Sequence, residues 1–203
     1  MDLYKYHSHP EQLNHYAEAD QIVPSRVYAK AQSGVKLTLK QINTIAKDVI
    51  YAYHYACYII KGPFPEGEDA IATDARYAYE YACNVIKGPF PKGEDAISKD
   101  AKYAFDYARD VLTSPFPKGE DTISKDAKHA YYYARYVIKG PFPKGEDAIA
   151  NNALCAYEYA RDILKRPFPK GENAIATDAY CAYRYAQKIL NLPEEQARQW
   201  GAK

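Results

Sequence analysis

The sequence has little of what usually accompanies nucleic-acid binding, secretion or membrane insertion. Its 27 Lys and Arg residues are balanced by 26 Asp and Glu residues, so the net charge is +1. It therefore lacks the basic excess typical of sequence-independent nucleic-acid binding. No apolar run approaches the ~20 residues of a membrane span, and the first residues, MDLYKYH, contain no signal-peptide core. We expect a soluble cytoplasmic protein that does not bind membranes.

Cysteine is scarce, and its spacing argues against disulfides and structural metal sites. The four cysteines form two pairs, Cys57 with Cys83 and Cys155 with Cys181, and each pair is 26 residues apart. Equivalent positions on stacked helices lie about 8–10 Å apart, whereas a disulfide needs Cα atoms closer than about 7 Å. No Cys-x-x-Cys or Cys-x-x-His zinc spacing occurs. The thiols are therefore predicted to be reduced.

Catalytic signatures are also missing. The sequence has no Gly-rich phosphate loop, no G-x-S-x-G elbow and no protease-like Cys/His motif. His7, His9 and His15 lie near the N-terminus, but this spacing without an accompanying carboxylate motif is a weak metal signal. We expect no enzyme activity and no cofactor or bound metal. A metal-dependent hydrolase or transferase using these histidines is the alternative that bound metal would reveal.

What the sequence does have is a strict repeat. A Pro-Phe-Pro triplet returns every 26 residues, at Pro63, Pro89, Pro115, Pro141 and Pro167. A fixed period of this length indicates one small unit stacked on copies of itself. We predict an all-α fold, an α-solenoid of stacked short-helix/long-helix pairs. The predicted divisions are a leader and capping segment at 1–37, tandem repeats at 38–190 and a capping helix at 191–203.

Each repeat contains start and stop signals for two helices. Asp74 recurs as Asp48, Asp100, Asp126, Asn152 and Asp178, which predicts an N-cap for every long helix. The first long helix of the regular series is expected to end at Lys87, with Gly88 as a left-handed cap. Pro65 suits the first position of a short helix that ends near Ala72.

Small and aromatic columns predict how the units pack. Ala78 and Ala82 and their equivalents let neighbouring long helices approach closely. Tyr81 and its equivalents form one aromatic column, and Tyr79 and its equivalents form a second, with rings buried and hydroxyls expected at the solvent edge. At the ends, residues 24–31 are predicted to form the helix before the first copy, and Trp200 to cover the last one.

Two segments carry a family resemblance. The residues from Ile97 to Ala108 and from Tyr136 to Glu146 resemble a tandem repeat of uncharacterised tailed-phage and bacterial proteins, whose usual form is IAKDPxYAYxYAxxVIKGRFPEGE. This chain has Ala after the capping Asp, where the family often has Pro, and Pro89 where it often has Arg. The resemblance implies a helical stack and a phage-type origin, with host cytoplasm as the location. It supplies no mechanism.

Outward positions that break the pattern are the candidate binding residues. Glu80 and Asn84, and their acidic equivalents, are replaced by Tyr132 and Tyr136 in the central repeat and by His54 and Tyr58 in the first. Tyr is enriched at interface hot spots, so these aromatics are predicted anchors for a protein partner. Alternatively, they simply lie over their neighbours.

Arg109, Arg135 and Arg161 form one column across three repeats, beside the aromatic column. Arginine with aromatics is the composition of a single-stranded nucleic-acid platform. The competing interpretation is that nearby Asp and Glu residues neutralise the column. We therefore interpret the chain as a non-enzymatic scaffold that binds a protein, possible roles being those of a phage accessory or anti-defence protein acting on a host factor. Single-stranded nucleic-acid binding is the alternative.

Overall fold

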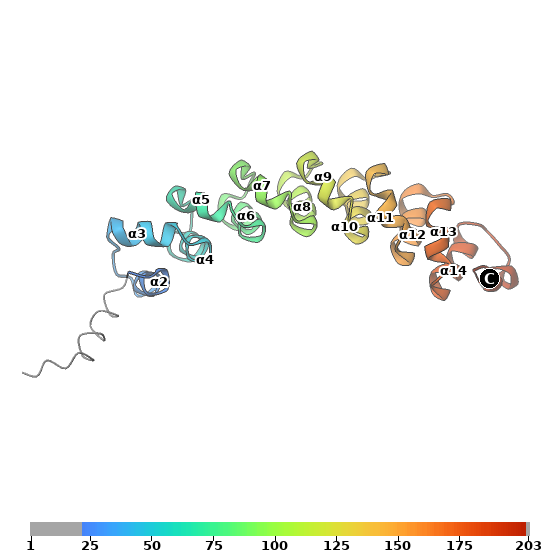
Figure 1. The fold of residues 1–203 in the computed structure, drawn as a ribbon, viewed down its shortest axis with the longest axis horizontal. Helices are drawn as coiled ribbons and strands as arrows, with labels where there is room; N and C mark the ends of the chain where they lie inside the picture. The colour runs from blue at the N-terminus through green and yellow to red at the C-terminus, as the bar shows by residue number, and fades with distance from the viewer. Residues whose placement is uncertain (1–21, 202–203) are drawn as a thin grey trace, which may run out of the picture.

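The protein is a curved row of helix pairs. A computed structural model describes residues 22–201, which contain helices and no strands. Short helices follow the convex edge of the arch and long helices follow the concave edge (Figure 1). Contacts join every long helix to the long helix of the next repeat. The predicted all-α solenoid of short-helix/long-helix pairs is confirmed.

The long helices are α4 (Val49–His54), α6 (Ala75–Tyr81), α8 (Ala101–Tyr107), α10 (Ala127–Tyr132), α12 (Ala153–Tyr159) and α14 (Ala179–Lys188). The first five continue into a π-helical turn, at Tyr55–Ile60, Ala82–Ile86, Ala108–Leu112, Tyr133–Ile138 and Ala160–Leu164. The short helices are α3 (Leu39–Ala46), α5 (Glu68–Ile71), α7 (Glu94–Ile97), α9 (Pro117–Ile123), α11 (Glu146–Ala150) and α13 (Glu172–Ile175). A 3₁₀ turn that begins at the second proline of the triplet precedes α5, α7, α11 and α13.

The predicted N-caps are confirmed at every long helix. In α6, for example, the Asp74 carboxylate accepts the N–H groups of Arg76 and Tyr77 at 2.9 and 3.0 Å. Asp48, Asp100, Asp126, Asn152 and Asp178 accept equivalent bonds. A side-chain oxygen satisfies donors that have no partner inside the helix, which sets where each long helix begins.

The helix ends differ from the sequence prediction. Lys87, and not Gly88, takes the left-handed conformation, with φ of 57°. The N–H groups of Lys87 and Gly88 both reach the carbonyl of Ala82, which widens the last turn into a π-helical one. Left-handed backbone strains a residue with a Cβ, and these capping bonds offset that strain. The Gly88 position therefore tolerates Ser114 and Arg166 in other repeats.

The Pro-Phe-Pro corner is held by a buried tyrosine of its own repeat. We call Tyr81, Tyr107, Tyr133, Tyr159 and Tyr185 the clamp tyrosines, and all are 0% exposed. The Tyr133 hydroxyl accepts the N–H of Phe116 at 2.7 Å and donates to Glu120 Oε1 at 3.1 Å. The prediction of hydroxyls at the solvent edge is wrong for this column, because the corner's backbone N–H needs a partner inside the core.

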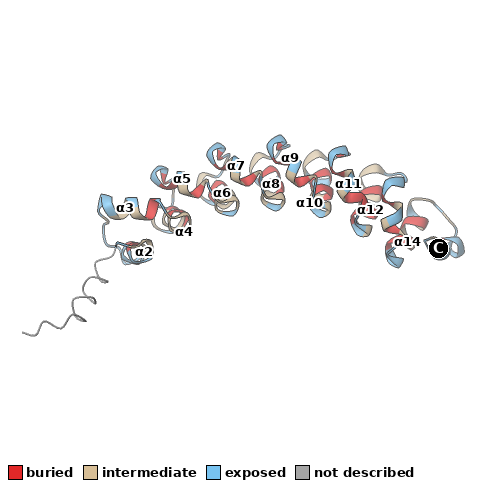
Figure 2. Ribbon diagram, in the orientation of Figure 1, coloured by how far each residue is buried: buried red, intermediate tan, exposed pale blue. Residues whose placement is uncertain are grey.

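Each corner also packs on the long helix of the preceding repeat. The Phe116 ring meets the Tyr107 ring at 5.3 Å between centroids in an edge-on arrangement. A Cβ on Gly119 would lie 2.6 Å from Phe116 Cδ1 and 2.8 Å from Ala104 Cβ. The glycine inside the short helix is thus required for close approach. The buried seam runs between the two rows of helices along the arch (Figure 2).

A ladder of ion pairs joins successive short helices on the surface. Lys118 lies 2.6 Å from Asp95, and Lys92–Asp69, Lys144–Asp121 and Lys170–Asp147 are its equivalents. The ladder stops where the pattern changes, with Glu66 at the first lysine position and Asn173 at the last aspartate position. These pairs are exposed, so each contributes little to stability.

Additional helices cover both ends of the stack. At the N-terminal end, α2 (Pro24–Gln32) places Tyr28 against Tyr51, with 5.6 Å between ring centroids. At the C-terminal end, α15 (Glu194–Gln199) brings Trp200 to 5.2 Å from the clamp tyrosine Tyr185. Trp200 thus takes the place of the phenylalanine that a further repeat would supply, as predicted. No helix within residues 22–201 is long and apolar enough to cross a membrane.

Candidate functional site: the outer face of the long helices

The predicted binding residues share one face of the long helices. Ala78 faces the next short helix, since the missing Cβ of Gly93 would lie 2.7 Å from its own Cβ. Glu80 follows Ala78 by two residues, or rather more than half a helical turn, and Asn84 follows Glu80 by one turn. The two columns that contain Glu80 and Asn84 therefore point away from the short helices. We call this surface the outer face.

Three hydrogen bonds across the outer face link neighbouring repeats. The Tyr79 hydroxyl donates to Asp110 Oδ2 at 2.9 Å, and the Tyr131 hydroxyl donates to Asp162 Oδ2 at 2.7 Å. Asn84 Nδ2 donates to the Tyr53 hydroxyl at 3.0 Å. In all three pairs the partner of the tyrosine lies 31 positions after it in the sequence. We call each such pair a rung.

The two exposed tyrosines among the predicted residues lie where no rung forms. The residue 31 positions before Tyr136 is Phe105, and the one before Tyr58 is Val27, so neither offers a hydroxyl. Tyr136 is 49% exposed and Tyr58 is 62% exposed. The sequence contains this relation as a pairing of Tyr with Asn or Asp at a spacing of 31, a signal that reading each column separately misses.

Tyr136 and Tyr132 belong to a central aromatic cluster. The Tyr132 ring is half-buried and lies 6.0 Å from the Phe105 ring and 5.9 Å from the Tyr136 ring. The Arg135 guanidinium lies 5.3 Å from the centre of the Tyr136 ring. Tyr136 is thus the exposed member of this cluster, and it packs on Tyr132 and Arg135.

Tyr58 and His54 belong to an equivalent N-terminal aromatic cluster, three repeats earlier. The His54 ring is half-buried, 5.7 Å from Tyr58, 6.1 Å from Tyr28 and 6.5 Å from Tyr77. His54 therefore packs as an aromatic among tyrosines, and Tyr58 is the exposed member. The same outer-face register places both clusters on one side of the arch.

The arginine column is paired with carboxylates along its length. Arg109 lies 2.6 Å from Asp110 and 3.0 Å from Asp106. Arg135 and Arg161 both contact Asp162, at 2.5 and 2.6 Å. These pairs favour the neutralised interpretation of the column over a free phosphate-binding stripe, because the guanidinium donors already have anionic acceptors.

Asp162 is the centre of this network. The hydrogen bond from Arg161 holds the pKa of its carboxyl below the ordinary 3.8, and the Tyr131 hydroxyl acts in the same direction. The pKa of the Asp110 carboxyl is lowered in the same way, first by the hydrogen bond from Arg109 and then by that from Tyr79. Both carboxylates therefore tie adjacent repeats together in their charged form.

These pKa shifts predict a loss of stability in acid. A carboxyl whose pKa is depressed in the folded state stabilises the fold above its unfolded pKa and loses this contribution as pH falls below about 3.8. We expect the urea midpoint to drop between neutral pH and about pH 3, and to drop less in Asp162→Asn, because the asparagine does not titrate. An equal drop in the variant would contradict the assignment.

Cys155 and Cys181 are buried, which disfavours their thiolate forms. Cys57, Cys83, Cys155 and Cys181 are all free thiols, as predicted. Burial raises the pKa of Cys155 to about 11 and, together with Asp178, raises that of Cys181 to about 12. A thiol with a raised pKa is a poor nucleophile at neutral pH.

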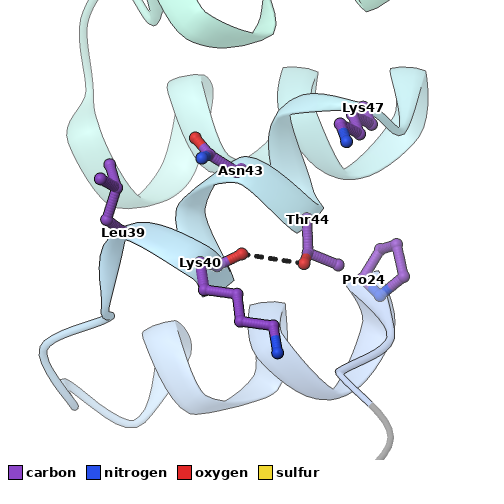
Figure 3. Close-up of a pocket in the computed structure, with 6 residues that line it drawn as sticks. All are labelled: Pro24, Leu39, Lys40, Asn43, Thr44 and Lys47. Atoms are coloured by element: carbon purple, nitrogen blue, oxygen red, sulfur yellow. Dashed lines mark hydrogen bonds between the residues drawn. The ribbon is translucent and has the colours of Figure 1, made fainter.

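An open groove of about 660 Å³ lies at the N-terminal end, where Pro24 of α2 faces Leu39, Lys40 and Thr44 of α3 (Figure 3). Within it the Thr44 hydroxyl donates to the Lys40 carbonyl at 3.0 Å. Within residues 22–201 no three His, Cys, Asp or Glu side chains are placed to hold a metal ion. His7, His9 and His15 lie outside the described residues.

Comparisons with protein families, with curated proteins and with solved structures found no match to this chain.

Proposed function

We propose that this chain is a non-enzymatic repeat scaffold that binds another protein through the outer face of its long helices. The observation that carries the proposal is the exposure of Tyr58 and Tyr136. Neither ring takes part in a rung, whereas Asp110 and Asp162, at the same position in other repeats, form rungs and ion pairs. Large exposed aromatics that the fold does not use are the residue type most enriched at binding hot spots.

The spacing of the two clusters suits a single partner. Three repeats separate them, which at about 8–10 Å per stacked helix is roughly 24–30 Å. A patch of that length fits a standard interface of about 800 Å² per partner. The similarity of the repeat to phage-encoded proteins makes a host factor, such as a defence component, the partner we expect in the cytoplasm.

The test is a paired alanine substitution. We expect Tyr58→Ala with Tyr136→Ala to weaken binding of the partner captured from host cells by at least about 10-fold, the equivalent of about 1.4 kcal/mol. Tyr180→Ala is the matched control, because Tyr180 is 64% exposed but lies outside both clusters. Purified partner would be titrated against each variant, with circular dichroism to verify folding.

Unchanged affinity in the double variant would remove the proposed anchors. Salt-sensitive retention of a single-stranded oligonucleotide at about 50 mM salt would instead support the alternative of a nucleic-acid platform. The carboxylate partners of Arg109, Arg135 and Arg161 argue against that alternative.

A further inference from the structure

The last rung of the outer face lacks a hydrogen-bond acceptor. Tyr157 in α12 is 1% exposed, and its buried hydroxyl has no acceptor. On the neighbouring helix α14, the buried Nε of Arg184 also lacks one. Within residues 22–201 these are the only two buried side-chain polar atoms left without a partner. A buried donor has lost its hydration, so an unmade bond there is unfavourable.

The other rungs show what is missing. The residue 31 positions after the tyrosine is Asn84, Asp110 or Asp162, and each contacts the tyrosine hydroxyl. The equivalent residue after Tyr157 is Lys188, which can only donate. The register is unchanged, because Leu192 N–H bonds to the Ala186 carbonyl as Gly140 N–H bonds to the Ala134 carbonyl. Lys188 thus occupies the position that an accepting aspartate holds in two of the three rungs, Asn84 being a donor in the third.

Arg184 belongs to the same place in the stack. It follows Tyr157 by 27 residues, as Tyr132 follows Phe105, and those two rings lie 6.0 Å apart. By this repeat register, three donors fall at one place on the outer face: the Tyr157 hydroxyl, the Arg184 guanidinium and the Lys188 ammonium.

Nearby carboxylates are already committed. The Arg161 guanidinium lies 5.0 Å from the centre of the Tyr157 ring, and it pairs with Asp162 at 2.6 Å and with Glu158 at 3.5 Å. Asp162 also serves the rung of Tyr131. Among the described residues 22–201, no carboxylate forms an ion pair with Arg184 or Lys188, so both side chains supply uncompensated positive charge.

We propose that an acidic side chain of the bound protein completes this rung, its carboxylate taking the acceptor position that Asp110 and Asp162 fill from within the chain. A carboxylate is the ligand of choice because two equivalent rungs already accommodate one. Lys188 is exposed at the end of α14, so an approaching anion meets its ammonium first. The inference rests on the proposed protein-binding function and adds an acidic contact to its partner.

The experiment is an NMR titration of the full chain with acetate, against chloride at a constant ionic strength of about 0.1 M. A short aspartate-containing peptide and inorganic phosphate form separate arms. We expect saturable shifts confined to the amides around Tyr157, Arg184 and Lys188 with acetate and with the peptide. Diffuse shifts, or phosphate binding more tightly than both carboxylates, would overturn the proposal.

Two substitutions make the test specific. Lys188→Asp installs an internal acceptor and is expected to abolish acetate binding, whereas Lys165→Asp makes the same charge change outside the rung and is expected to keep it. Retention in Lys188→Asp would overturn the proposal. Tyr58→Ala with Tyr136→Ala is expected to bind acetate normally, so failure of the aromatic anchors and failure of this site are distinguishable.

A matched pair of tyrosines provides a readout without ligand. In chloride, Tyr131→Phe is expected to lower the urea midpoint, because the hydroxyl that Asp162 accepts is lost. Tyr157→Phe is expected to leave it unchanged, because its hydroxyl has no acceptor to lose, and to abolish the acetate shifts. Equal losses in the two variants would show that the Tyr157 hydroxyl already has an acceptor, and would overturn the proposal.

Discussion

Phe116→Ala is expected to lower the free energy of unfolding by about 3–5 kcal/mol, the usual cost of truncating a buried phenylalanine. The Phe116 ring is 3% exposed, packs on the Tyr107 ring and covers Gly119. Its removal leaves a cavity between α8 and α9, and the small residues Gly119 and Ala104 beside it cannot fill that cavity. Urea unfolding followed by circular dichroism measures the loss.

The position of this residue adds a second expectation. Stability in a repeat array comes from the units and from the interfaces between neighbours. A weak interface in the middle of the row should therefore broaden the transition or divide it in two. Phe116→Leu, which refills most of the volume, is the control. A single transition with an unchanged midpoint in Phe116→Ala would show that the corner does not hold the stack together.

Tyr133→Phe is expected to lower the free energy of unfolding by about 1–3 kcal/mol, although only one oxygen atom is removed. That oxygen accepts the Phe116 N–H at 2.7 Å and donates to Glu120 at 3.1 Å. Without it, the backbone N–H is buried with no acceptor. The urea midpoint relative to the unmodified protein gives the size of the effect.

Tyr136→Phe is the matched control for this substitution. It removes the same atom from a ring on the same helical segment that is 49% exposed, where water replaces any lost contact. We expect its free energy of unfolding to stay within about 0.5 kcal/mol of that of the original protein. Equal effects in the two variants would mean that the clamp hydroxyl is not needed by the corner.

Local signals explain which parts of the fold could be predicted. Asp74 and its equivalents cap helices through bonds to N–H groups two or three residues away, so sequence spacing suffices to place the helix starts. The period of 26 and the proline positions likewise set the order and approximate length of the helices. The helix ends were harder, because the choice of Lys87 over Gly88 as the left-handed residue depends on two N–H groups sharing the Ala82 carbonyl.

The candidate site was predicted in part. The break in pattern at Tyr58 and Tyr136 is visible in the sequence, and both side chains are exposed. His54 and Tyr132 were also predicted binding residues, but both are half-buried. Rings that lie 23 to 27 residues away in the sequence pack against them, which the sequence pattern does not reveal. Pairing between the arginines and Asp110 or Asp162 was one of two interpretations, and only side-chain geometry distinguishes them.

The architecture of this protein could be predicted from its sequence, because a strict repeat leaves stacking as the way to bury each unit's apolar face. Its composition also excluded a strong charge bias. The three-dimensional packing was needed to learn which tyrosine hydroxyls are buried in clamps, which join rungs and which, like that of Tyr157, lack an acceptor. The physical reason is that a hydrogen bond is satisfied by whatever lies within about 3 Å in space, and here that partner is 13 to 31 residues away along the chain.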